Sequence, residues 1–292
     1  MNTRLLEISL KAIARLPYRV MLAVGRLVGT LAFFLGANRR RIARINLEKC
    51  FPELNTAERR ALLKAQFQAT GMGLLEAAFA WYGDEKRVMS RCAISGRSHL
   101  EQALAQGKGV ILLTFHYPCL DLAGIQLSHE YPVGFMQRPH NDPEMDKIIT
   151  GGRMRYAKRA VSRHSPRDML KALKENLVVC YYPDHDLGRK ASEFAPFFGV
   201  QTAWVSAISR MAHMSGAPVV PMLCERLPKA AGLHLRLLPA LEQFPSEDVV
   251  ADLTRVSQLL ETHLREHPEN YLWTHRRFKT RPEGEASFYA RH

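Results

Sequence analysis

The distribution of apolar and polar residues divides the chain into a helical N-terminal part and a longer part in which strands and helices alternate. In residues 1–16, apolar residues recur at helical spacing with basic residues between them, as in an amphipathic helix lying on a membrane. Pro17 interrupts this pattern, and residues 20–37 are then apolar apart from Arg26. Residues 55–81 carry another apolar face at helical spacing. We therefore expect helices over residues 1–16 and 55–81, with an apolar membrane-anchoring segment between them.

After residue 84, short apolar runs alternate with amphipathic segments. The run at residues 110–115 is continuous and follows a Gly-Lys-Gly turn, which is typical of a strand buried on both faces. We expect further strands at residues 133–136, 177–182, 217–223 and 233–238, and helices at residues 122–129, 143–156, 166–175, 204–214 and 249–266. This alternation predicts an α/β fold with a single mixed, mostly parallel sheet flanked by helices. We assign residues 1–45 to the membrane anchor and residues 46–292 to one domain built on this sheet.

The apolar run at residues 110–115 is followed directly by His116, and Asp121 lies five positions further on. The C-terminal end of a parallel strand is where open α/β sheets place their ligands. A spacing of five does not put two residues on one helix face, so they meet only if Pro118 makes a turn that returns Asp121 at the start of the next helix. The pair would then be a general base held in one tautomer by a carboxylate. The alternative is a structural histidine and an aspartate that caps a helix.

The positive charge of the chain is concentrated at its N-terminus. Ten Lys and Arg residues against two Glu residues give residues 1–50 a net charge of +8, out of +13 for the whole chain. Beside an apolar segment, this favours an anionic membrane surface over nucleic acid, for which neither zinc-finger spacing nor interleaved aromatic residues are present. Arg26 would cost about 2.5 kcal/mol or more at the centre of a bilayer. We therefore expect a retained anchor that either lies in the interface or forms a marginal span, with residues 39–41 on the cytoplasmic side.

The five cysteines are scattered, odd in number and without a Cys-x-x-Cys pair, which favours reduced thiols in a cytosolic compartment. Cys119 lies beside His116, but we consider a nucleophilic role for it the weaker reading. Gly-x-Ser-x-Gly, Walker A and Gly-x-Gly-x-x-Gly motifs are all missing from the sequence. The covalent hydrolase, nucleotide-driven and dinucleotide-dependent classes are therefore disfavoured.

The His116-x4-Asp121 spacing resembles the motif of glycerolipid-type acyltransferases. Taken with its flanks, the chain resembles the late acyltransferases of lipid A biosynthesis, the lauroyl/myristoyl family. The resemblance covers nearly the whole chain in the expected order, through Arg138-Pro139-His140-Asn141-Asp142-Pro143, Gly152-Arg153-Met154-Arg155, Pro183-Asp184-His185-Asp186-Leu187-Gly188 and Trp273-Thr274-His275-Arg276-Arg277-Phe278-Lys279. One departure is Asp121 itself, because many lipid A members have Glu at this position.

The resemblance implies a glycerolipid acyltransferase-like domain at residues 46–292 and a defined reaction. An acyl chain would pass from an acyl–acyl carrier protein to a hydroxyl of a phosphorylated glycolipid, the lipid A precursor, with His116 as general base oriented by Asp121. Arg153 would assist the transfer or bind a substrate phosphate. The thioester is already activated, so no cofactor, metal or nucleotide is implied.

Four further residues are candidates for binding substrate: Arg138, Arg155, Asp184 and Asp186. The plain alternative for the arginines is solvated surface charge, and Asp184 could simply cap its own turn. The loop at residues 183–188 follows an expected strand and should lie on the same edge of the sheet as His116. His116, Asp121 and the acidic and histidine residues of this loop could also supply ligands to a divalent ion, although the family needs none.

The resemblance places the protein at the inner membrane, with its catalytic domain on the cytoplasmic side and no nucleic-acid partner. Two other functions remain open from the sequence. The acceptor could be another membrane lipid, such as a lysophospholipid or an amino-acid lipid. The protein could also be a membrane lipid-binding protein that has kept the fold without catalysis.

Overall fold

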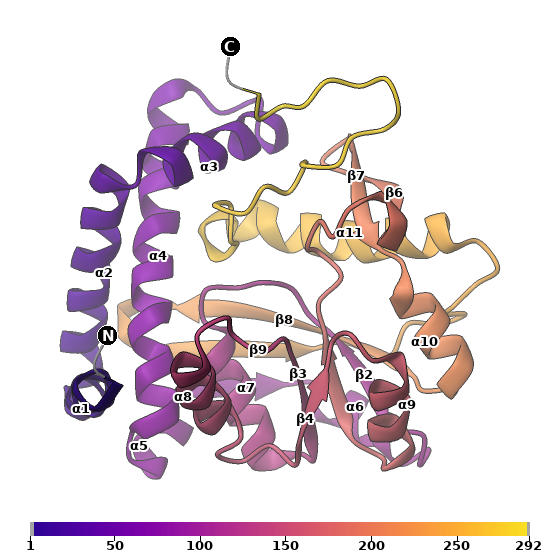
Figure 1. Ribbon diagram of the computed structural model, residues 1–292, viewed down its shortest axis with the longest axis horizontal. Coiled ribbons are helices and arrows are strands. Elements are labelled where there is room, and N and C mark those ends of the chain that lie inside the picture. Colours follow the sequence, from indigo (N-terminus) through magenta and orange to yellow (C-terminus); the bar gives the residue numbers. More distant parts are fainter. Residues whose placement is uncertain (1–2, 291–292) are drawn as a thin grey trace.

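The computed structural model describes residues 3–290, and the N-terminal part of the chain is helical as expected (Figure 1). Its helices are α1 (Thr3–Arg15), α2 (Tyr18–Leu35), α3 (Ala37–Cys50) and α4 (Thr56–Tyr82). Pro17 separates α1 from α2, because a proline cannot supply the backbone N–H that a continuous helix needs. Helix α3 was not predicted, and the expected boundary between residues 45 and 46 falls inside it.

Helix α2 packs directly against α4 through glycines. A Cβ atom built on Gly71 would lie 2.2 Å from the carbonyl oxygen of Gly25, and one on Gly29 would lie 2.2 Å from the carbonyl oxygen of Phe67. Such short distances leave no room for a side chain, so the two backbones are in contact. The apolar N-terminal segment is therefore attached along its length to the rest of the fold.

The central sheet has seven strands in the order β1-β9-β8-β2-β5-β3-β4. Every neighbouring pair is parallel except β8 and β9, which confirms the predicted mixed, mostly parallel α/β sheet. The strands are β1 (Cys92–Ser95), β2 (Val110–Leu113), β3 (Val133–Gln137), β4 (Arg159–Ser162), β5 (Val178–Tyr181), β8 (Val219–Leu227) and β9 (Gly232–Leu237). All four residues of β2 are buried, as the continuous apolar run predicts.

Helices cover the sheet on both sides (Figure 1). They are α5 (Glu85–Met89), α6 (Arg97–Leu104), α7 (Leu120–Glu130), α8 (Pro143–Arg153), α9 (Pro166–Lys174), α10 (Ala207–Ser215) and α11 (Val249–Glu266), with short 3₁₀ turns at Arg189–Ala191, Pro228–Ala230 and Pro268–Asn270. A separate antiparallel hairpin of β6 (Ser192–Phe197) and β7 (Val200–Val205) was not predicted. Residues 204 and 205 belong to this hairpin, so the helix expected at residues 204–214 begins only at Ala207.

A buried ion pair joins the N-terminal helices to the sheet. The carboxylate of Glu76 on α4 is fully buried and accepts two hydrogen bonds from Arg226 of β8, at 2.5 and 2.6 Å. It also accepts one from the hydroxyl of Tyr18 at the start of α2, at 2.5 Å. Removing one partner of such a pair strands a buried charge and typically costs about 3–5 kcal/mol. This cluster therefore fixes α2 and α4 to strand β8.

The C-terminal segment after α11 returns across the molecule to α3 (Figure 1). The side-chain amide of Asn46 donates to the carbonyl oxygens of Trp273 and His275, both at 2.7 Å. Arg41 donates to the carbonyl oxygen of Tyr289 at 3.2 Å. Arg39 donates to the carbonyl oxygen of Thr274 at 3.3 Å, so the expected anchor and the C-terminal motif at residues 273–279 are in contact.

Candidate active site

The candidate site lies at the edge of the sheet where β2, β5, β3 and β4 end. These four strands are neighbours and mutually parallel, so their following loops all emerge at the same edge. The loop after β2 carries His116, and the loop after β5 carries Asp184. The loop at residues 183–188 therefore lies on the same edge as His116, as predicted.

His116 is held by Asp184. Its ring Nδ1 lies 2.8 Å from Asp184 Oδ1, and its backbone N–H donates to Asp184 Oδ2 at 3.0 Å. Burial raises the pKa of Asp184, but the charge and hydrogen bonds of His116 outweigh this effect. The net shift of the pKa is downward, so the carboxylate is ionised. An ionised carboxylate can only accept, so Nδ1 donates to it, and in the neutral ring the lone pair is then on Nε2. The imidazole is thereby prepared to act as a base through Nε2.

Asp121 pairs with Arg153 and not with His116. It lies in the first turn of α7, where it accepts hydrogen bonds from Arg153 Nε at 2.7 Å and from the terminal guanidinium nitrogen Nη2 at 3.3 Å. Burial lowers the pKa of Arg153, but Asp121 more than compensates and the net shift is upward. The prediction that Asp121 orients His116 is therefore corrected. The carboxylate that binds the imidazole is Asp184, in the loop after the neighbouring strand β5. Asp121 instead holds Arg153.

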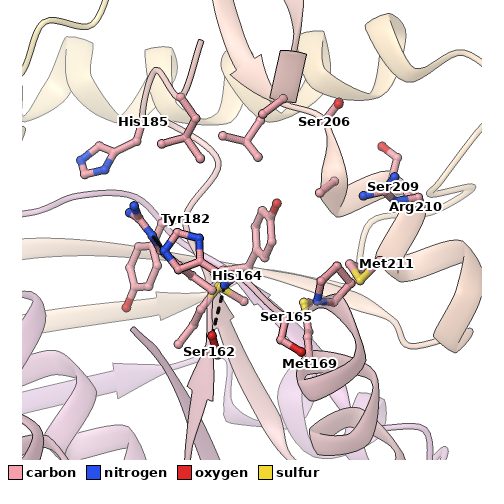
Figure 2. Close-up of a pocket in the computed structure, with 18 of the residues that line it drawn as sticks. Ser162, His164, Ser165, Met169, Tyr182, His185, Ser206, Ser209, Arg210 and Met211 are labelled. Atoms are coloured by element: carbon pink, nitrogen blue, oxygen red, sulfur yellow. Dashed lines mark hydrogen bonds between the residues drawn. The ribbon is translucent and has the colours of Figure 1, made fainter. Parts of the chain in front are cut away.

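A cavity of about 830 Å³ opens beside these residues and is lined by both His116 and Arg153. It extends between the ends of β3 and β4 and the helices α9 and α10. Figure 2 shows Met169, Met211 and several serines around it, with His185 across from Arg210. Its apolar lining includes Leu120, Phe135, Met136, Met169, Leu187, Val205, Met211 and Val249. A volume of this size is typical of a small-molecule site, and its lining combines these apolar side chains with many polar and charged ones.

The ring of His116 is packed in a stack of three histidines. His185 lies parallel to it with ring centroids 3.4 Å apart, and His275 stacks on His185 at 4.4 Å. Burial and the neighbouring His116 lower the pKa of His185 to about 3, and burial with Arg277 lowers that of His275 to about 4. Both rings are therefore neutral near pH 7 and support His116 without adding charge. From the sequence, His185 was considered only as a possible metal ligand and His275 had no assigned role, although both lie in the quoted motifs at residues 183–188 and 273–279.

Comparison with known proteins assigns the family. The sequence model of the family described as bacterial lipid A biosynthesis acyltransferase matches residues 3–280. The chain belongs to this family. It is 37% identical to the lipid A biosynthesis lauroyltransferase of Escherichia coli (strain K12) over 278 residues, covering 95% of this chain and 91% of that protein. It is 36% identical to the lipid A biosynthesis palmitoleoyltransferase of the same strain, covering 94% of this chain and 90% of the relative. The resemblance found in the sequence motifs is thereby confirmed.

Among solved structures, this lipid A acyltransferase family member overlaps with the 1-acyl-sn-glycerophosphate (LPA) acyltransferase, PlsC, of Thermotoga maritima. The two are 15% identical, with a TM-score of 0.41, and the overlap covers 85% of this chain and 98% of that chain. That similarity is too low to bear on the function.

The remaining predicted site residues of this family member fall into two groups. Arg138 lines the cavity and donates to Asn141 Oδ1 at 3.2 Å. Arg155 does not line it, because its guanidinium donates to the carbonyl oxygen of Gly83 at 2.8 Å, at the C-terminal end of α4. Asp186 is also engaged within the protein, accepting from the backbone N–H and hydroxyl of Thr280 at 2.6 and 2.7 Å. The contacts of Arg155 and Asp186 stabilise the fold, and we assign them no part in binding substrate.

The same geometry bears on two alternatives considered from the sequence, a metal site and a cysteine nucleophile. Within residues 3–290, no group of three or more His, Cys, Asp or Glu side chains is arranged to hold a metal ion. Cys119, the residue weighed as a nucleophile, is buried with its sulfur 3.3 Å from that of Cys224, and it does not line the cavity. Of the three residues predicted to be catalytic, His116 and Arg153 line the cavity.

Proposed function

We propose that the protein transfers a fatty acyl chain from the thioester of an acyl carrier protein to a hydroxyl of a phosphorylated lipid A precursor. The observation that carries this proposal is the hydrogen bond between His116 and the buried Asp184, at a cavity that Arg153 also lines. This arrangement supplies a positioned base, a cation and an apolar space together. Family membership supports lipid A as the acceptor class.

In the proposed reaction, Asp184 fixes the imidazole of His116 with its proton on Nδ1. Nε2 takes the proton of the acceptor hydroxyl, whose oxygen attacks the thioester carbonyl to form a tetrahedral oxyanion. The intermediate then collapses, the carbon–sulfur bond breaks, and the imidazolium returns the proton to the departing thiolate. General-base catalysis of this kind contributes roughly 10²- to 10⁴-fold in rate.

Arg153 is the cation proposed to stabilise developing negative charge, either on the oxyanion or on a substrate phosphate. Its guanidinium lies over the ring of Phe135 at 4.8 Å, and Asp121 holds one edge of it through Nε and Nη2. Asp121 is thus a positioning residue in this scheme, because it acts through Arg153. A cation that is already oriented needs no rearrangement as charge develops, which is why such groups contribute strongly to catalysis.

The cavity lining supports an acyl chain and an acidic donor. Its apolar side chains would hold the fatty acyl group of the thioester. Arg138, Arg163, Lys190 and Arg210 also line it, and they would attract an acidic carrier protein or the phosphates of the acceptor.

We further propose that the protein works on the cytoplasmic side of the inner membrane. Within residues 3–290, α2 is the one helix that is long and apolar enough to cross a membrane, by length and composition alone. Large apolar side chains are exposed on α1, α2 and α4, at Leu5, Ile8, Val20, Val24, Leu27, Val28, Leu31, Phe34, Leu35 and Leu74. Because the other face of α2 packs against α4, we infer that α2 lies in the membrane interface with its exposed face in the lipid.

The proposal is tested with the purified full chain, an acyl–acyl carrier protein and a tetra-acylated lipid A precursor, with the product analysed by mass. One added acyl group is expected with the native protein and none with His116→Ala, while the control His99→Ala on α6 keeps the activity. Acylation of a lysophospholipid in place of the precursor would overturn the assigned acceptor. Tight lipid binding without any product would overturn the catalytic role.

A further inference from the structure

A second crevice, of about 610 Å³, lies away from the active site, where the end of α2, helix α3 and the start of α4 meet. Figure 1 shows this corner at one end of the helix pair α2 and α4, far from α9 and α10 beside the catalytic cavity. Five arginines line the crevice, Arg40, Arg41, Arg44, Arg59 and Arg60, and Glu48 is the one carboxylate among the lining residues. The crevice therefore carries a formal excess of four positive charges.

Three of these five arginines are held in place by backbone carbonyl groups. Arg40 donates to the carbonyl oxygen of Phe34 at 3.0 Å, and Arg59 donates to that of Leu54 at 2.6 Å. Arg41 donates in the same way to the C-terminal segment. Among residues 3–290, Arg44 is the one member of the five with a carboxylate within 4 Å, and its Nε lies 3.8 Å from Glu48. A carbonyl orients a guanidinium without neutralising it, so the positive charge remains available to an anion.

The crevice is continuous with the exposed apolar face of α2. Leu31, Phe34 and Leu35 form the end of that face, and Phe34 itself lines the crevice. Phe34 is 59% exposed and Leu35 is 83% exposed. A long apolar face that ends at a cluster of arginines matches the shape of a lipid, which has apolar chains and a charged headgroup at one end.

We propose that this crevice binds the headgroup phosphate of an anionic membrane lipid whose acyl chains pack against Phe34 and Leu35 at the end of α2. The inference rests on the membrane attachment proposed above and adds a specific lipid site to it. The exposed Phe34 and Leu35 favour a lipid over an acidic protein, because they continue the exposed apolar face of α2 that we place in the membrane. The phosphate can belong to a phospholipid or to a phosphorylated glycolipid, since the recognised group is the same.

The test is co-sedimentation of the full chain with two kinds of vesicle, phosphatidylcholine alone and a roughly three-to-one mixture of phosphatidylcholine and phosphatidylglycerol. The crevice variant is Arg44→Gln with Arg60→Gln, because both side chains are exposed and can be changed without removing a backbone contact. The control variant is Lys171→Gln with Lys174→Gln on α9, which removes the same charge from two exposed positions elsewhere. Thermal unfolding is measured first, to show that both variants have the same Tm as the native protein.

On the anionic vesicles, the crevice variant is expected to bind about fivefold more weakly for each charge removed, or roughly thirtyfold in total. The control should bind like the native chain, and all three proteins should bind neutral vesicles equally. The variant Arg44→Lys with Arg60→Lys keeps the charge but loses the planar fork, so it should recover only part of the binding. In a competition experiment, vesicles that contain the lipid A precursor compete with the phosphatidylglycerol vesicles for the protein. The preferred vesicle shows whether the phosphate comes from a phosphorylated glycolipid or from a phospholipid.

Three results would overturn the lipid site. An equal loss in the crevice and control variants would mean that only net charge matters. Full recovery by the lysine variant would mean that the crevice supplies positive charge alone, without a bidentate phosphate site. Unchanged vesicle binding with a weaker affinity for the acyl carrier protein would make the crevice a protein-docking surface. Failure of all the proteins to bind either vesicle would instead contradict the proposed membrane attachment.

Discussion

The imidazole of His116 is hydrogen-bonded to the carboxylate of Asp184, a residue 68 positions further along the chain. The two residues meet because β2 and β5 are parallel neighbours, so the loops that follow these strands leave the sheet side by side. Asp184 binds both the ring and the backbone N–H of His116, which fixes the position and the tautomer of the ring together.

This relationship predicts that Asp184→Asn lowers kcat by about 10²- to 10⁴-fold, with little change in KM. Asparagine keeps the size of the side chain but has no negative charge to stabilise the imidazolium that forms during transfer. The measurement is steady-state kinetics across a range of pH, because the pH profile of a base without its carboxylate should also shift. A kcat within a few-fold of the native value would remove Asp184 from the mechanism.

Asp121 and Arg153 should behave as one unit in a double-mutant cycle. We expect Asp121→Ala and Arg153→Ala each to lower kcat/KM, and the double variant to lose less than the sum, with a coupling energy of about 1–3 kcal/mol. The matched control is Arg97 with Glu130, which forms a similar pair at 2.9 Å outside the cavity. Additive effects at Asp121 and Arg153 would show that Asp121 acts on the substrate directly.

Gly73 of α4 should be sensitive to the addition of a single methyl group. A Cβ at this position would lie 2.0 Å from the carbonyl oxygen of Pro118, in the loop between His116 and Asp121. Gly73→Ala must displace that loop, so we expect a loss of about 1–3 kcal/mol in the free energy of unfolding and a lower kcat. The control is Gly151→Ala in α8, where a Cβ would meet nothing within 4 Å and alanine should be neutral or slightly stabilising. Equal effects of the two changes in urea titrations would contradict this packing.

His263 should make the stability of the protein depend on pH. It is buried, its Nε2 lies 3.0 Å from the carbonyl oxygen of Cys224, and burial together with His267 lowers its pKa from 6.5 to about 4. Between these two values the unfolded chain binds a proton that the folded chain does not, so the free energy of unfolding falls as the pH drops from 6.5 towards 4. The full contribution is present above pH 6.5.

Urea titrations at the two ends of this range, for the native protein and His263→Gln, measure the effect. The decrease between pH 6.5 and 4 should be smaller in the variant by roughly 3 kcal/mol. Because each protein is compared with itself, any general loss of stability from the substitution cancels. An identical decrease in both proteins would mean that His263 does not titrate as described.

The sequence predicts the fold class and most elements of the sheet, because buried parallel strands and amphipathic helices have distinct periodicities. It also selects His116, Arg153 and Asp184 as site residues. It does not predict that His116 and Asp184 are partners. Local spacing suggests only local partners such as Asp121, whereas the order of strands in a sheet depends on packing between distant segments.

The elements that were missed have weak local patterns. Helix α3 contains the run Arg39, Arg40 and Arg41, and its buried residues form a narrow face that is hard to recognise in the sequence. In the hairpin of β6 and β7, Pro196 interrupts the run of strand residues, and this favours a loop over a strand. The histidine stack was also missed, because His275 reaches the site only through the path of the C-terminal segment.

The contact of Glu76 with Arg226 has a consequence for how substrate reaches the site. It joins the apolar helix pair to β8, and β8 lies beside β2, which leads to His116. The exposed apolar face of α2 and the catalytic edge therefore belong to one packed unit, so in the proposed membrane attachment the depth of α2 in the interface would set the height of the imidazole above the bilayer. Under the proposed function, the acceptor hydroxyl would have to extend out of the membrane by a fixed distance to be acylated, so the enzyme would select acceptors by how far this hydroxyl protrudes.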